Sequence, residues 1–154
     1  MQTKTRSLVG TVALLALPWC ALADVRADEP LPKQQLTPTE VTSMAAAKPA
    51  APVQMTNLVG DPTKPGLYTV RVAIAAGTQV QPHTHRDNRS VTVVSGVWRM
   101  AYGKTFDAKA LKELPTGSVY TEPAGLPHFA HAADGPVVIL VTGYGPSDTE
   151  FVAK

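Results

Sequence analysis

The pattern of hydrophobic and polar positions changes near residue 54 of the 154-residue chain. From there on, short runs rich in β-branched and aromatic residues alternate with Gly- and Pro-containing turns, which is typical of antiparallel sandwiches and barrels. We therefore expect an all-β domain over residues 54–154. The predicted strands are Gln54–Leu58, Tyr68–Ala75, Val80–His85, Ser90–Ser95, Val97–Tyr102, Ser118–Glu122, His128–Ala132 and Val137–Tyr144.

One helical segment is expected inside this domain, at Asp107–Glu113. Asp107 is a suitable N-cap, Leu111 and Leu114 would form an apolar face, and the following Pro and Gly would end the helix. Aromatic and Met side chains of the neighbouring strands are expected to fill the barrel interior or its cavity, with core packing as the favoured role. They are Tyr120, Phe129, Trp98, Met100 and Tyr102.

Residues 24–53 differ from the domain because Pro and Ala dominate them, a composition that favours extended backbone over a packed fold. We interpret this segment as an N-terminal arm. It contains one helix signal, with Thr37 as N-cap, Pro38 at the first helical position and Glu40 at the third, followed by Val41 to Ala47. The arm is either a tether or a segment that lies across a neighbouring subunit.

Residues 1–23 have the features of a cleaved signal peptide. Lys4 and Arg6 precede an apolar run of about ten residues, and Ala21-Leu22-Ala23 offers a cleavage site after Ala23. Because a membrane span needs roughly 20 apolar residues, no stable membrane anchor is expected, and the protein should be periplasmic or secreted. Lipidation of Cys20 is the alternative, disfavoured by the bulky Trp19 before it.

Removal of the predicted signal peptide also changes the charge and the cysteine content. It takes away two basic residues and the single cysteine, and leaves equal numbers of basic and acidic side chains. A nearly neutral chain without a basic patch argues against nucleic acid as a partner. Disulfides cannot stabilise this fold, so burial or a metal must do so.

Three histidines carry the main chemical signal. His83 and His85 are two residues apart, so on a strand both point to the same face, and His128 would begin another strand after a Pro- and Gly-containing turn. Imidazole nitrogens suit divalent ions such as Zn, Mn, Fe or Ni. His131 would face the opposite side of its strand from His128, so we expect it on the surface.

The spacing of these residues resembles the cupin superfamily. Its first motif is present as Gly77, five residues, His83-Thr84-His85, three residues, Arg89, six residues and Gly96. Its second motif is present as Gly117, five residues, Pro123-Ala124-Gly125, two residues, His128, three residues and Ala132. The glycines are expected at turns that require positive φ. The resemblance implies an RmlC-like double-stranded β-helix, or jelly roll, with one divalent metal ion held by His83, His85 and His128. It also implies a small-molecule substrate or ligand and a homodimer, with residues 31–58 as the expected contact.

The sequence departs from the family pattern at two positions. The family's metal-binding glutamate falls at Arg89, whose guanidinium has no acceptor for a cation, and its terminal asparagine falls at Ala132. Glu122 is the candidate replacement, either as a fourth ligand or as a hydrogen-bonding partner of bound water. Arg89 would either enter the cavity, where it could pair with Glu122 or bind an anionic substrate group, or face solvent at the rim.

The sequence leaves three functions open. The first is a metal-dependent enzyme, similar to cupin dioxygenases or isomerases, in which Arg89 and Glu122 orient or deprotonate the substrate. The second is a non-catalytic cupin that binds a small ligand or a metal. In the third, the histidines keep the fold geometry without a metal, because the cationic Arg89 would repel one.

Overall fold

A computed structural model describes residues 30–46 and 51–153. The predicted signal peptide, its cleavage site and the first residues of the arm lie outside this part of the chain. Within the described residues, no helix combines the length and the apolar character that crossing a membrane requires. The elements are α1 (Pro38–Ala46), β1 (Val53–Val59), β2 (Gly66–Ile74), β3 (Gln79–Thr84), β4 (Arg89–Ser95), β5 (Val97–Tyr102), β6 (Lys112–Pro115), β7 (Val119–Glu122), β8 (His128–His131), β9 (Val137–Gly145) and β10 (Glu150–Phe151).

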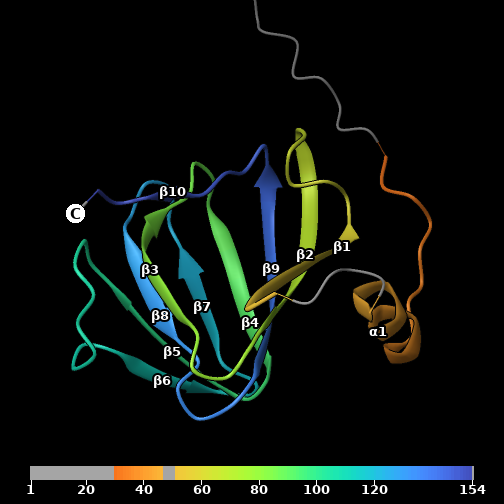
Figure 1. Cartoon of the computed structure of the whole chain (residues 1–154). Helices are drawn as coiled ribbons and strands as arrows, with labels where there is room; N and C mark the ends of the chain where they lie inside the picture. Colours follow the sequence, from red (N-terminus) through yellow and green to blue (C-terminus); the bar gives the residue numbers. More distant parts are fainter. Residues whose placement is uncertain (1–29, 47–50, 154) are drawn as a thin grey trace, which may run out of the picture.

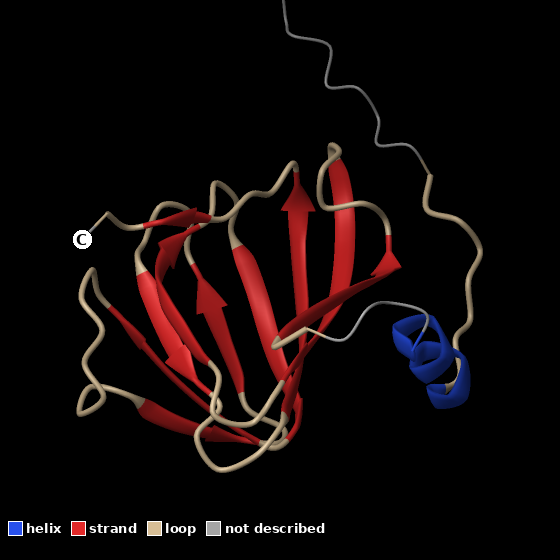
Figure 2. Cartoon of the chain, viewed as in Figure 1, coloured by secondary structure: helices blue, strands red, loops and turns tan. Residues whose placement is uncertain are grey.

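The strands form two five-stranded antiparallel sheets that face each other (Figures 1 and 2). The first sheet has the order β1-β2-β9-β4-β7 and the second has the order β10-β3-β8-β5-β6. Neighbours in both sheets are mostly far apart in sequence, as in a jelly roll. The predicted all-β jelly-roll fold is confirmed.

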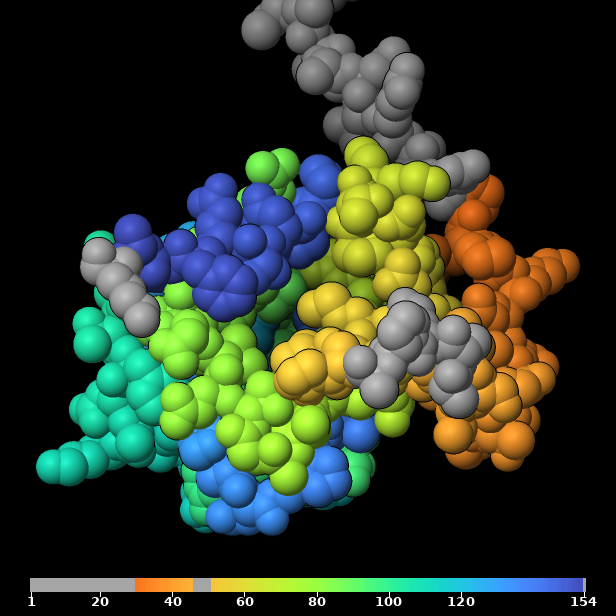
Figure 3. Space-filling model, viewed as in Figure 1, coloured from red at the N-terminus to blue at the C-terminus, as the bar shows by residue number. Residues whose placement is uncertain are grey.

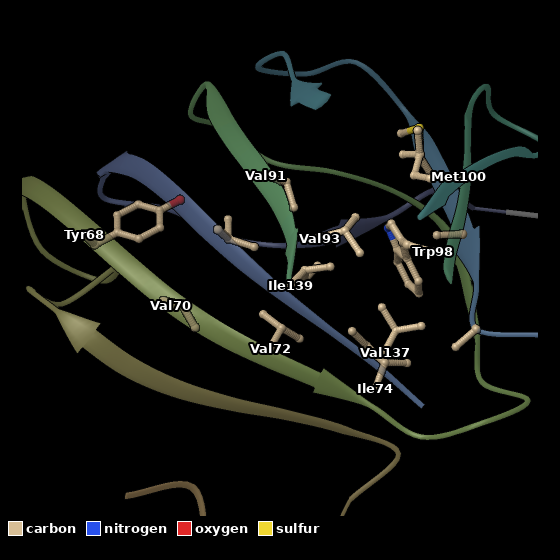
Figure 4. Close-up of a cluster of buried hydrophobic side chains, with 14 residues drawn as sticks. Tyr68, Val70, Val72, Ile74, Val91, Val93, Trp98, Met100, Val137 and Ile139 are labelled. Carbon is tan, nitrogen blue, oxygen red and sulfur yellow. The ribbon is translucent and has the colours of Figure 1, made fainter. Parts of the chain in front are cut away.

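The hydrophobic core lies between the two sheets (Figure 4). β2 and β9 pair over nine residues each, and their buried positions alternate strictly with more exposed ones. Because side chains alternate across a strand, this pattern lines one face of the first sheet with Val, Ile and Tyr. Trp98 and Met100 of β5 meet that face from the opposite sheet.

The predicted helix at Asp107–Glu113 is wrong. Asp107 caps only a turn, with its carboxylate accepting from Lys109 N at 2.9 Å, and the chain then continues as β6. Glu113 pairs with Arg99 of β5, and Leu114 is buried in the core. A helix of seven residues gains little by itself, whereas the strand gains a ladder and a buried leucine. β10 was also absent from the predicted strands.

The helix predicted in the arm is confirmed as α1. The Thr37 backbone N–H donates to Glu40 Oε2 at 2.7 Å and the Glu40 N–H donates to Thr37 Oγ1 at 3.4 Å, which is a reciprocal capping box. The arm packs on the outer face of β1 of its own chain, where the Gln54 side chain donates to Ala45 O and Thr56 is 2% exposed.

The four glycines of the two motifs have positive φ, as predicted. At Gly96, with φ of 83°, a Cβ atom would lie 2.5 Å from Pro136 O, so both the backbone conformation and the space exclude a larger residue. These turns fix the strands that carry the histidines.

Candidate metal centre

Three imidazole rings meet inside the barrel. His83 lies on β3 and is the register partner of His128 at the start of β8, while His85 follows β3 directly. All three are at most 7% exposed, and one nitrogen of each lies within 4.8 Å of the other two. The structure thus brings together the three histidines that the sequence predicted as ligands.

The orientation of each ring is fixed by a backbone carbonyl. The Nδ1 atoms of His83, His85 and His128 lie 2.7, 2.5 and 3.1 Å from the carbonyl oxygens of Gln81, Asp148 and Leu126, respectively. Because a carbonyl only accepts, Nδ1 carries the proton in each ring and Nε2 keeps its lone pair.

The Nε2 atoms of His85 and His128 are buried and have no hydrogen-bond partner among the described residues. Burial lowers the pKa of His83 to about 4, and burial followed by the charge of Arg89 lowers the pKa of His85. Both rings are therefore neutral near pH 7. Neutral imidazoles with converging, unsatisfied lone pairs are the donor set that a divalent metal ion requires.

Arg89 faces the cavity, not the rim. It is the register partner of Glu122 across β4 and β7, and both side chains point inward, 10% and 6% exposed. Arg89 Nε donates to Glu122 Oε2 at 2.7 Å, and Arg89 Nη2 donates to the same oxygen. The guanidinium charge that would repel a metal ion is thus paired with a carboxylate.

The Glu122 carboxylate lies beside two of the three histidines. Its Oε1 is 3.5 Å from His128 Nε2 and its Oε2 is 3.8 Å from His85 Nε2. Among the described residues, the group whose ligand atoms all lie within 4.8 Å of one another consists of the histidines without Glu122. The position allows either a fourth ligand or a group that contacts bound water or substrate.

The charge state of Glu122 is set by opposing effects. Burial is the largest effect and opposes its ionisation, but the charge of Arg89, the neighbouring histidines and the hydrogen bonds from Arg89 together hold the pKa below its usual range. Oε1 also accepts from the Tyr120 hydroxyl at 3.1 Å, and Tyr120 accepts from Trp98 Nε1 at 2.9 Å. Glu122 is therefore an ionised carboxylate held from two sides.

The site opens into a cavity of about 380 Å³. One end carries the histidines with Arg89, Glu122 and Tyr120, and the walls are aliphatic side chains from both sheets with Trp98 and Met100. Figure 3 shows a hollow in the surface between the C-terminal segment and β1.

Sequence reasoning missed the C-terminal segment, residues 147–151, which also lines the cavity. Asp148 supplies the carbonyl for His85, and the Phe151 ring lies 5.7 Å from the His83 ring. Tyr68 was also missed; it lines the cavity, and its hydroxyl donates to Asp87 at 2.6 Å. No motif marks these residues.

The remaining predicted residues lie in several different environments. Trp98, Met100 and Tyr120 line the cavity as expected. Tyr102, in contrast, is 47% exposed, and its hydroxyl donates to Thr121 O, so its expected interior position is wrong. Phe129 is buried on the outer side of β8, where it packs against Phe106. His131 is half-buried and does not line the cavity, in agreement with the strand alternation.

Residues 58–151 match a family model whose description is Cupin. Comparison with curated proteins gives no match. The fold is similar to several solved structures. One is the polyketide cyclase RemF from Streptomyces resistomycificus, at a TM-score of 0.56 and 17% identity over 67% of this chain and 72% of that chain.

Two further similar structures are enzymes of greater length. Salicylate 1,2-dioxygenase from Pseudoaminobacter salicylatoxidans has a TM-score of 0.54 and 14% identity over 68% of this chain and 30% of that chain. The DMSP lyase DddQ from Ruegeria pomeroyi has a TM-score of 0.51 and 21% identity over 60% of this chain and 47% of that chain. At such identities these likenesses establish the fold alone.

Proposed function

The chain belongs to the cupin family, and on that premise we propose that it is a metal-dependent enzyme acting on a small, largely apolar substrate. In this proposal His83, His85 and His128 hold one divalent ion, of the class Zn, Mn, Fe or Ni. The observation that carries the proposal is the pair of buried Nε2 atoms without hydrogen-bond partners in the described part of the chain. A buried, unsatisfied acceptor costs about 1–3 kcal/mol, so these two nitrogens need a compensating ligand.

The bound ion would supply Lewis acidity and open coordination positions for substrate or oxygen. The protein's own contribution lies in Glu122. Oε2 is occupied by two Arg89 donors and Oε1 accepts from Tyr120, which leaves one free lone pair on Oε1, the oxygen that lies 3.5 Å from His128 Nε2. We assign Glu122 as the acceptor of a proton from a substrate hydroxyl or enol, and Arg89 as the residue that fixes the carboxylate in place.

The cavity walls define the class of substrate. They are mostly aliphatic and aromatic side chains, and the charged Arg89 and Glu122 lie together beside the histidines. A molecule with two oxygen donors at one end and an apolar body fits this division, whereas a sugar would leave its hydroxyls unpaired against the walls. The dioxygenase and the lyase among the similar structures are consistent with small-molecule turnover in this fold.

The metal site is tested by elemental analysis of protein purified without chelator. We expect about one equivalent of divalent metal in the wild type, loss of the metal in His128→Ala, and retention in His131→Ala. The last variant is a matched control, because His131 lies on the same strand and faces away from the cavity. Wild-type protein without stoichiometric metal would refute the proposal.

The role of Glu122 is tested with Glu122→Gln, which keeps the size of the side chain and removes the base. We expect metal content to be retained and turnover to fall by about 10²–10⁴-fold, the usual contribution of a general base. Glu113→Gln, at an exposed outer position, is the control. Loss of metal in Glu122→Gln would instead make Glu122 a fourth ligand.

Turnover itself is tested by oxygen uptake with diketones, thiols and phenols. Stoichiometric metal with tight ligand binding but no product from any of these classes would favour a non-catalytic binding protein. Location is a separate proposal, namely export after cleavage of the signal peptide. N-terminal sequencing of protein from the culture medium or the periplasm should then begin at Asp24.

A further inference from the structure

The C-terminal segment, residues 147–151, orients one of the three histidines. His83 and His128 have carbonyl partners that lie two residues earlier in the chain. His85 Nδ1 instead lies 2.5 Å from Asp148 O, and the Thr149 hydroxyl oxygen is 3.4 Å from the same nitrogen. The orientation of the His85 ring therefore depends on a residue 63 positions away in the sequence.

The backbone contacts of this segment lie at its two ends. At one end the Ser147 N–H donates to Pro62 O at 2.7 Å, and at the other the Val152 N–H donates to Pro82 O at 2.9 Å. Between them, β10 forms a ladder of two residues with β3, and both residues of β10 are exposed (Figure 1). A short, exposed edge strand opens at a lower free energy than the strands of the core.

Asp148 fixes the middle of the segment to the chain beside His85. Its Oδ1 accepts from the Arg86 backbone N–H at 3.0 Å, and its Oδ2 accepts from Arg86 Nε at 2.6 Å. Two such bonds set the orientation of a carboxylate as well as its position. Asp148 thus binds two consecutive residues, Arg86 through its side chain and His85 through its carbonyl, and the first contact places the second.

On the premise that the three histidines hold one ion, we propose that Arg86 and Asp148 are positioning residues of the metal centre. Their ion pair holds the C-terminal segment on His85, so that metal binding and docking of this segment strengthen each other. An ion at Nε2 requires the ring to carry its proton on Nδ1, and the carbonyl that accepts this proton stabilises that form. Such partners commonly change metal affinity by about 10–100-fold.

The exposure of the ion pair separates this role from a purely structural one. The side chains of Arg86 and Asp148 are 60% and 29% exposed, and ion pairs so accessible to water contribute little to the free energy of unfolding. Loss of the pair should therefore weaken metal binding while global unfolding stays nearly unchanged.

The coupling also reaches the substrate cavity. Ser147, Asp148, Thr149 and Phe151 line it, so the segment that orients His85 is also part of the cavity wall. By thermodynamic reciprocity, the factor by which docking raises metal affinity is the factor by which the ion stabilises docking. The cavity wall is therefore completed most firmly when the ion is bound.

The affinity of the full-length, metal-free protein for Zn²⁺ tests this proposal, measured by competition with a chromophoric chelator. Zn²⁺ is a suitable probe because nitrogen sites for Mn²⁺ or Fe²⁺ also bind it, and more tightly. We expect Arg86→Gln and Asp148→Ala each to weaken binding by about tenfold or more. Arg99→Gln should leave the affinity unchanged, because Arg99 pairs with Glu113 and Asp134 on the outer face of the second sheet.

The sign of the Arg86→Gln effect is decisive. Removal of a nearby positive charge would by itself strengthen the binding of a cation, whereas loss of positioning weakens it. Circular dichroism and urea unfolding of the same samples report whether each variant is folded.

Hydrogen exchange of the wild type provides a second readout that needs no variant. Saturating Zn²⁺ should raise the protection of the Ser147 and Val152 amides by about tenfold and leave α1 unchanged. Zn²⁺ binding with equal affinity in wild type and Arg86→Gln, or without added protection at these amides, would overturn the coupling and leave the proposed metal site standing. A wild type that binds no Zn²⁺ would overturn both.

Discussion

The buried Arg89–Glu122 pair makes a quantitative prediction. Replacing Arg89 by Met keeps most of the side-chain volume and leaves the Glu122 carboxylate buried without its cationic partner. Because the two side chains are only 10% and 6% exposed, we expect the variant to lose about 3–5 kcal/mol of the free energy of unfolding. The double variant Arg89→Met/Glu122→Leu, in which both charges are gone, should lie within about 1 kcal/mol of the wild type.

The assay is urea unfolding followed by circular dichroism, with linear extrapolation of the free energy. Chelator is present throughout, so that metal binding to the folded state does not contribute. Arg99→Met is the matched control, because Arg99 pairs with exposed carboxylates on the outer face and should cost much less than Arg89→Met. If Arg89→Met costs no more than Arg99→Met, or if the double variant costs the sum of its single changes, the assignment of a buried, coupled pair is refuted.

Three further outcomes are expected. Burial and the hydrogen bond to Asp87 raise the pKa of Tyr68 to about 12, so its contribution to stability is complete below about pH 10 and is lost as the pH rises through 12. Thermal unfolding at pH 9 and pH 11 should therefore differ less in Tyr68→Phe than in the wild type. Gly143→Ala should cost about 1–3 kcal/mol in urea unfolding, because the new Cβ would lie 2.5 Å from the Tyr68 hydroxyl. Thr37→Ala removes the cap shared with Glu40, and hydrogen exchange should show about 1 kcal/mol less protection in α1 with global unfolding unchanged.

The interior positions of the histidines were predictable because they depend on strand alternation and on two motifs. His83 and His85 share a face through their spacing, and the glycine turns place His128 opposite. The interior position of Arg89 was left open for a physical reason. It depends on the register between β4 and β7, which are joined by a long excursion through β5 and β6, and no local pattern sets that register.

The predictions that were wrong or missing have a common cause, which is long-range packing. The segment Lys112–Pro115 has a weak helical signal, and only its ladder with β5 makes it a strand. Tyr102 has the inward parity of Trp98 and Met100, yet it lies at the end of β5, where the barrel no longer encloses it. The cavity contacts of Asp148 and Phe151 arise because β10 pairs with β3, a contact between segments about 65 residues apart that no propensity reveals.

The backbone carbonyls that accept from the three histidine Nδ1 atoms lie at different sequence distances from their histidines. Gln81 and Leu126 each precede their histidine by two residues, so the rings of His83 and His128 are oriented locally. His85 depends on Asp148, which the ribosome adds after every strand except β10. During synthesis, two of the three donors can therefore be positioned early, whereas the third acquires its proton arrangement only when the end of the barrel closes. The three histidines therefore present their Nε2 atoms together only after the C-terminal segment has folded.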